Sequence, residues 1–139
     1  MHEFSLDPRL QSDCHTLGEL GENLLLLMDN SLLPWFVIVP KENVTEIYEL
    51  TQEKQLEVLD LINRISVFVK QHFNIDKLNI AAIGNIVSQL HIHLVGRRRD
   101  DYCWPGVVWG VAQKQVYKKQ EVSRIKMLLV SNILLFDPV

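Results

Sequence analysis

The sequence predicts a protein of the α+β class, and three observations support this. Two short apolar runs, at 24–28 and 32–39, are separated by a turn signal and have the length of strands. The stretch 51–73 carries apolar residues three or four positions apart, which is the spacing of an amphipathic helix. From position 87 to 94, polar and apolar residues alternate, as they do along a half-buried strand. Strands and helices joined by short links are typical of an α+β arrangement.

The first half of the chain should contain a strand hairpin. Residues 8–14 can form a short helix ahead of it. The apolar run 24–28 ends at an Asp-Asn pair, which favours a turn. The run within 32–40 is rich in aromatic and β-branched residues and ends at a proline, which fits a second strand of about six residues. A short helix should follow at 43–50, where Asn precedes Glu by three positions.

One long helix should then cover a face of the sheet. Thr51 can cap this helix, which we expect to run to about Phe73. Its expected buried stripe consists of Leu56, Leu59, Ile62, Ile65 and Val69.

The second half of the chain should add two strands and a C-terminal helix. We expect a strand at 78–83, a tight turn at Gly84-Asn85 and the alternating strand after it. A helix is expected at about 120–130. The apolar tail 133–136 should pack on the sheet or on a partner subunit. We expect a single domain over residues 1–139, with a core at about 20–110 and a C-terminal extension at 111–139.

The composition is that of a soluble globular protein. Hydrophobic residues make up 47% of the chain and charged residues 22%, and the formal net charge is −3. This charge argues against nucleic acid as the main partner, since phosphate backbones bind basic surfaces. The apolar stretches are too short to cross a membrane, and the start lacks the features of a signal peptide, so we expect a cytoplasmic protein. Cys14 and Cys103 lack the spacing of a zinc cluster or a disulfide framework.

The alternating stretch carries the residues best suited to chemistry. Gln89, His91 and His93 occupy every second position, so a strand would place them on one face. Three successive polar residues on one face favour a site, and the alternative is a solvated face of an open sheet.

Two kinds of chemistry suit a pair of histidines with this spacing. One imidazole can act as a nucleophile while its neighbour handles a proton or holds a phosphate oxygen. Alternatively, both can bind a metal ion, which would need a third ligand. Asp13 or His15 could be brought close enough to supply it. We favour phosphate chemistry and expect neither a metal nor another cofactor.

Other polar residues near this stretch could contact an anion. The Gly84-Asn85 turn could direct backbone N–H groups toward a phosphate, although an ordinary turn has the same sequence. Arg97 lies at the end of the strand, where its guanidinium could reach a phosphate. Trp104 and Trp109 fit the core, a subunit contact or a surface on which a base stacks.

The segment Gln89-Leu90-His91-Ile92-His93-Leu94-Val95-Gly96-Arg97 resembles the signature of the histidine triad (HIT) family, in which three histidines alternate with apolar residues. The resemblance extends to 36–41, a strand that ends in Pro-Lys, and to 28–30, which is similar to a ribose-binding segment. Trp104-Pro105-Gly106 is similar to a segment of the nucleotide-binding members. In all, about residues 20–110 are covered.

The resemblance implies a fold and an assembly. The fold is a five-stranded antiparallel sheet with two main helices, to which the C-terminal helix predicted above is added. The assembly is a homodimer with a continuous sheet. The partner is a nucleotide or dinucleotide substrate, and no cofactor is implied. Neither nucleic acid nor a membrane is expected as a partner.

The resemblance also implies residue roles in hydrolysis or transfer at a nucleoside α-phosphate. His91 would attack phosphorus and form a covalent nucleotidyl-histidine, and His93 would contact the phosphate and assist the leaving group. Asp29 would hold the ribose, and Asn79 would lie near the phosphate, as Asn85 would.

Gln89 departs from the family pattern, since it stands where the first histidine of the triad is expected. An amide donates and accepts hydrogen bonds but carries no charge at neutral pH. We therefore expect the rate or the specificity to depend on this position. The alternative function is a nucleotide-binding or regulatory module whose altered triad has lost turnover.

Overall fold

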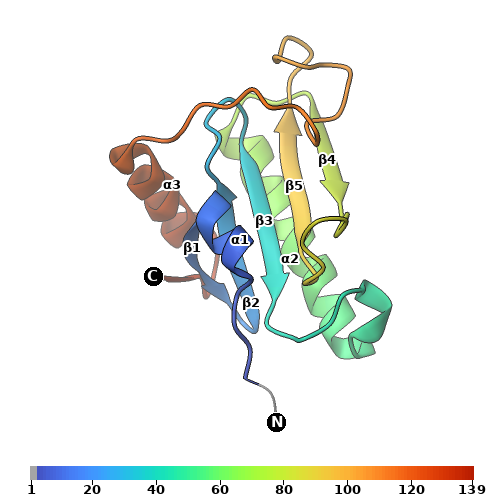
Figure 1. Ribbon diagram of the computed structural model, residues 1–139. Coiled ribbons are helices and arrows are strands. Elements are labelled where there is room, and N and C mark those ends of the chain that lie inside the picture. Colours follow the sequence, from blue (N-terminus) through green and yellow to red (C-terminus); the bar gives the residue numbers. More distant parts are fainter. Residues whose placement is uncertain (1–2) are drawn as a thin grey trace.

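An antiparallel sheet forms the centre of the computed structural model, which describes residues 3–139 (Figure 1). Its strand order is β4-β5-β3-β2-β1-β6. The strands are β1 (Cys14–Leu20), β2 (Asn23–Met28), β3 (Trp35–Pro40), β4 (Lys77–Ala81), β5 (Ile92–Arg97) and β6 (Asp137–Pro138). The α+β class and the β2–β3 hairpin are confirmed. The sheet has six strands rather than the expected five, because the chain end adds the two-residue β6.

The residue pattern gave no strand at β1, for two structural reasons. The strand contains a register irregularity between Thr16 and Gly18, which interrupts its alternation. β6 also crosses close to Gly18, where a Cβ atom would overlap the backbone of Asp137. A glycine is therefore required inside this strand, although glycine normally weakens a strand prediction.

The helices agree with the sequence in position and length. They are α1 (Pro8–Asp13), α2 (Gln52–His72) and α3 (Lys119–Asn132), with a short 3-10 helix, η1 (Ile47–Glu49), before α2. The Thr51 side chain accepts a hydrogen bond from the backbone N–H of Lys54 and caps α2 as expected. None of the helices in residues 3–139 is long and apolar enough to cross a membrane.

The expected buried stripe of α2 is partly wrong. Leu56 and Leu59 are 60% and 53% exposed. The helix instead buries Val58, Leu61, Ile65, Phe68 and Val69. Both sets keep a spacing of three or four positions, so the spacing alone could not decide which of two overlapping stripes faces the sheet.

The two faces of the sheet have different covers. On one face, β3 and β5 contribute Phe36, Ile38 and Leu94 to a core that α2 and α3 complete. On the other face, Trp35 and Val95 pack in a second cluster with α1 and the segment around residue 108. Figure 1 shows α2 behind the sheet and α1 in front of it. The histidines lie on the front face.

The predicted strand at 87–94 is shorter in the structure. β5 begins only at Ile92, and the backbone bends at 85–86 and again at Gln89. Leu90 donates its backbone N–H to the carbonyl of Val44, 3.0 Å away, instead of continuing the ladder with β3. Only His93 of the three polar residues therefore lies on the strand.

The C-terminal region packs on the sheet, as one of the two expected alternatives has it. α3 buries Ile125 and Leu129 in the core beside α2. Phe136 is buried in the same core, whereas Leu134 and Leu135 are exposed. The tail thus inserts one aromatic ring and then pairs with β1.

Candidate active site

A cleft of about 560 Å³ lies on the front face of the sheet. His91 and His93 form part of its lining, Asp29 comes from the end of β2, and Asn85 comes from the loop between β4 and β5. The segment 108–114 forms another wall. Four of the seven predicted site residues therefore meet in one cleft, although they are far apart in the sequence.

His91 is oriented by the backbone just before it. Its Nδ1 lies 2.7 Å from the carbonyl oxygen of Gln89. A carbonyl oxygen only accepts, so Nδ1 carries the hydrogen and Nε2 of the neutral ring keeps its lone pair. The hydrogen bonds of the described residues include none to this Nε2. The ring is thus held in the tautomer that a nucleophile requires.

His93 is oriented by a tryptophan on the neighbouring strand. The indole Nε1 of Trp35 lies 3.0 Å from His93 Nδ1. Indole N–H is a donor only, so His93 Nδ1 must accept and its own hydrogen lies on Nε2. The pairing of β3 with β5 accounts for the contact: His93 is opposite Val37, and Trp35 is the diagonal neighbour on the same face.

The two imidazoles therefore have complementary states. Their ring centroids are 4.9 Å apart, with the planes at 72°. His91 offers an unprotonated Nε2 and His93 offers an Nε2–H donor. Burial, with a smaller contribution from neighbouring His91, lowers the pKa of His93 from 6.5 to about 4. His93 is consequently neutral at physiological pH.

The lowered pKa of His93 should make folding stability depend on pH. The unfolded chain binds this proton below about pH 6.5, whereas the folded chain resists it down to about 4. Stability is therefore complete above pH 6.5 and falls as the pH drops to 4, by up to ~3 kcal/mol. Urea unfolding at pH 7, 6, 5 and 4 should show this decline, and His93→Gln should reduce its slope. An equal slope in both proteins would contradict the assignment.

Asp29 lies at the rim of the cleft with one oxygen engaged. Its Oδ1 accepts from the backbone N–H of Tyr117 and lies 2.9 Å from His15 Nε2. Burial raises the pKa of this carboxyl, but the hydrogen bonds from Tyr117 and His15 outweigh that effect and lower it. The carboxylate is thus charged and fixed, and both bonds end on the same oxygen. Oδ2 is available to a ligand hydroxyl.

Gln89 does not line the cleft, contrary to the expectation that its side chain shares a face with His91. Its Oε1 accepts from the backbone N–H of Asp7 and its Nε2 donates to the carbonyl of Ser5, at 2.9 and 2.8 Å. The amide thus ties the N-terminal segment to the bend before β5. What Gln89 gives to the site is its backbone carbonyl, which holds the His91 ring.

Arg97 and Asn79 also lie outside the cleft, so the expected phosphate contacts are not supported. The Arg97 side chain is 1% exposed and forms a two-point ion pair with Asp101, at 2.8 and 3.1 Å. Its remaining donors reach the Asn79 side chain and the carbonyl of Gly106. The guanidinium is therefore fully used within the protein.

The role of Arg97 is to hold a loop. Asp101 accepts further hydrogen bonds from the backbone N–H groups of Arg98, Cys103 and Trp104. The guanidinium also lies 5.5 Å from the centre of the Trp104 ring. This network fixes the loop that leads to Trp109, which lines the cleft next to His93.

Three site residues were missed or left open by sequence reasoning. Trp35 was assigned to a strand without a role in the site, yet it is the hydrogen-bond partner of His93. Tyr117 contributes only a backbone N–H, for which no sequence signal exists. His15 was considered as a metal ligand, but the structure pairs it with Asp29. Among the described residues, no group of three or more His, Cys, Asp or Glu side chains is placed to hold a metal ion.

The comparison with known families follows from this site. A family model described as "HIT domain" matches residues 9–100. The chain belongs to the HIT family. The resemblance found in the sequence is thereby confirmed, and His91 and His93 fall inside the matched region.

Solved structures of HIT proteins are similar over nearly the whole chain. A histidine triad protein from Marinobacter aquaeolei VT8 is 37% identical, with a TM-score of 0.90, over 95% of this chain and 97% of that chain. One from Bradyrhizobium japonicum is 36% identical, with a TM-score of 0.90, over 95% of this chain and 99% of that chain. The HIT-like fold expected from the sequence is thus confirmed.

A curated relative is similar over a shorter region. The bis(5′-adenosyl)-triphosphatase of Dictyostelium discoideum is 34% identical over 98 residues, which cover 66% of this chain and 64% of that protein. The chain therefore spans less than two thirds of the length of this relative.

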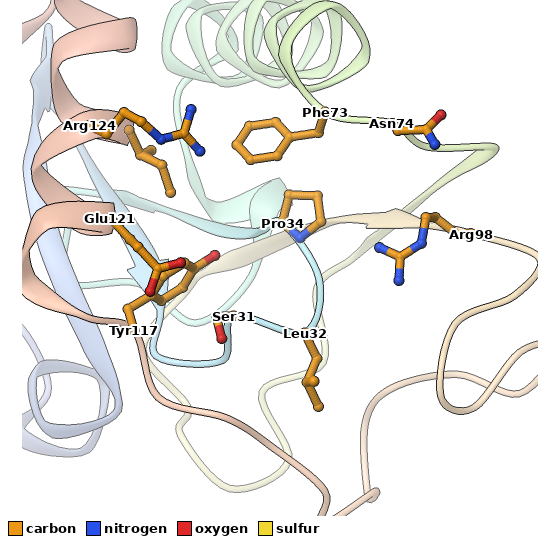
Figure 2. A pocket seen from close by; sticks show the side chains of 10 residues that line it. Ser31, Leu32, Pro34, Phe73, Asn74, Arg98, Tyr117, Glu121 and Arg124 are labelled. Atoms are coloured by element: carbon orange, nitrogen blue, oxygen red, sulfur yellow. The ribbon is translucent and has the colours of Figure 1, made fainter.

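This HIT protein has a second cavity, of about 380 Å³, between α3, the loop after β2 and the start of the loop after β5 (Figure 2). Arg98 and Arg124 line it, together with Tyr117 and Glu121. The residues that line it include no histidine or cysteine, so it offers no nucleophile. The backbone of Tyr117 links its wall to Asp29 in the cleft.

Proposed function

We propose that the protein is a nucleotide hydrolase or nucleotidyltransferase that acts at a nucleoside α-phosphate through a covalent nucleotidyl-histidine. The substrate would be a dinucleoside polyphosphate or a nucleoside phosphoramidate. The observation that carries this proposal is the 2.7 Å contact between His91 Nδ1 and the Gln89 carbonyl, which leaves His91 Nε2 as a free nucleophile in the cleft.

The reaction proceeds in two displacements. The lone pair of His91 Nε2 forms a bond to the α-phosphorus, and the bond to the leaving group breaks with its electron pair on that group. Water then attacks phosphorus, the phosphorus–nitrogen bond breaks, and its electron pair returns to Nε2. The proton of the water passes to solvent, and the nucleoside monophosphate leaves. In a transferase, another hydroxyl takes the place of water.

The remaining cleft residues bind and orient the substrate. His93 Nε2–H donates to a phosphate oxygen beside the attacked phosphorus, since it lies next to His91. Asp29 Oδ2 accepts from the ribose hydroxyls, because its other oxygen is already engaged. Asn85 lies in the loop opposite the histidines and contacts the phosphates. Gln89, Asn79 and Arg97 act as positioning residues.

The family and the named relative support this assignment. Membership of the HIT family and the similarity to a bis(5′-adenosyl)-triphosphatase both favour a nucleotide hydrolase. The first triad position differs from the family pattern, but its side chain lies outside the cleft. The substitution at Gln89 therefore leaves the nucleophile in place.

A homodimer through β4 is part of the proposal. β4 lies at the edge of the sheet, with β5 as its one neighbour in the described residues, and Ile80 on it is 46% exposed. An unpaired edge with an exposed apolar residue favours pairing with a second copy. Light scattering should then give twice the mass of one chain, and the mass of a single chain would contradict it.

The function is tested by hydrolysis of diadenosine triphosphate in ¹⁸O-labelled water. Attack at the α-phosphorus places the label in AMP and leaves ADP unlabelled. Label in ADP would place the attack at another phosphorus and contradict the proposal. Binding of AMP without any turnover would instead favour the regulatory module.

A further inference from the structure

We propose that Trp35 restricts His93 to the role of a neutral hydrogen-bond donor, so that this site accepts leaving groups that depart without a proton, such as a nucleoside polyphosphate, in preference to amines. This inference rests on the proposed function and narrows its substrate class. It starts from the contact between the indole Nε1 and His93 Nδ1.

The Trp35–His93 contact is buried and leaves one protonation state for the ring. Trp35 is 8% exposed and His93 is 6% exposed. Protonation of His93 would add a hydrogen to Nδ1, which would then face the indole N–H donor at 3.0 Å. Two buried donors would oppose each other, and a hydrogen bond would be lost. The neutral ring with its hydrogen on Nε2 is therefore strongly favoured.

The other groups around His93 do not favour its charged form. His91 is the titratable neighbour, and its positive form would repel a second charge. Trp109 lies on another side, with its ring centroid 5.4 Å away. The residues paired with His93 are Val37 on β3 and Ala81 on β4, both uncharged. The charged side chains that line the cleft are Arg9, Asp13, Asp29 and Lys114.

No carboxylate of the described residues pairs with His93. Asp29 bonds to His15 and Tyr117, and Asp13 pairs with Arg9 at the surface. A histidine that acts as a general acid usually needs such a partner to hold its proton near neutral pH. With a pKa of about 4, on the order of one His93 in a thousand is charged at pH 7.

The lack of an acid matters differently for the two substrate classes. When a polyphosphate is attacked, the phosphorus–oxygen bond breaks and the leaving phosphate carries the electron pair as a stable anion. When a phosphoramidate is attacked, the phosphorus–nitrogen bond breaks and the nitrogen must gain a proton to leave as an amine. His91 cannot supply it, because its hydrogen is bound to the Gln89 carbonyl, and the Gln89 amide lies outside the cleft.

The protonation state can be measured directly in the free protein. The ¹⁵N chemical shifts of the wild-type His93 ring should show hydrogen on Nε2 alone at pH 7. In Trp35→Phe, which keeps an aromatic ring but removes the donor, both tautomers should appear and the pKa should rise from about 4 toward 6.5. Trp109→Phe is the matched control, since this ring touches His93 without a hydrogen bond, and its His93 shifts should match the wild type. Hydrogen on Nδ1 in the wild type would overturn the proposal, whether or not the variant folds.

The leaving-group preference is measured as a ratio of kcat/KM values. Wild-type protein at pH 7.5 should cleave diadenosine triphosphate at least ~100-fold faster than an adenosine phosphoramidate of an alkylamine, since general acid catalysis contributes about that much or more. At pH 6, Trp35→Phe should reduce this ratio roughly tenfold, because more His93 is charged. Equal rates on both substrates, or a ratio that Trp35→Phe leaves unchanged, would overturn the inference. Failure to cleave either substrate would refute the proposed function and this preference with it, while the NMR result would still report on Trp35.

Discussion

Replacement of His91 by alanine should reduce hydrolysis of diadenosine triphosphate by at least ~10³-fold and leave nucleotide binding within a few-fold of the wild type. His91 supplies the one lone pair that the geometry directs at phosphorus, so its loss removes the covalent route. Binding depends mainly on other groups of the cleft, among them Asp29 and Asn85. Steady-state kinetics and calorimetry with AMP separate the two effects.

Ser88→Ala is the control for this variant. Ser88 is exposed, lies three positions before His91 and is not part of the cleft lining. Its activity should equal that of the wild type. Turnover by His91→Ala at more than a tenth of the wild-type rate would show that another group attacks the phosphate.

Replacement of Asp101 by asparagine should destabilise the fold by about 3 kcal/mol or more, the largest stability effect that we expect of a single polar substitution. Asp101 and Arg97 are 0% and 1% exposed at their side chains, so the substitution leaves a buried guanidinium without its counter-charge. Burial raises the pKa of Asp101, but hydrogen bonds from Arg97, Arg98 and Cys103 outweigh it and hold the pKa at about 2. The charged pair therefore persists at every pH at which the protein is studied.

Asp100→Asn is the matched control, one position earlier in the same loop. Asp100 pairs with Arg98 at 3.1 Å, but its side chain is 85% exposed. Exposed pairs contribute little, so the free energy of unfolding in urea should change by less than about 1 kcal/mol. Equal losses in the two variants would contradict the structural role assigned to the buried pair.

Much of the fold could be predicted from the sequence because its signals are local. The proline-bounded run at β3, the Thr51 cap and the apolar spacing of α2 each depend on a few neighbouring residues. The β1 strand and the β6 pairing could not be predicted, because Gly18 is explained only by a segment at the other end of the chain.

The candidate site divides in the same way. The spacing of His91 and His93 is local, and both lie in the cleft as expected. The expectations for Gln89 and Arg97 failed because they depended on partners that the spacing does not reveal. The backbone bend near residue 89 turned the amide toward Ser5 and Asp7, and the buried Asp101 took the guanidinium. Trp35 was missed for the same reason, since only strand pairing brings it to His93.

The account depends most directly on the covalent bond to His91. Protein mixed with diadenosine triphosphate, quenched in base within milliseconds and digested should yield an adenylylated peptide, with the modification on His91 Nε2 by fragmentation mass spectrometry. His91→Ala should yield no such peptide, and Ser88→Ala should yield as much as the wild type. Rapid turnover without any adduct, or an adenylyl group on His93 instead of His91, would contradict the account.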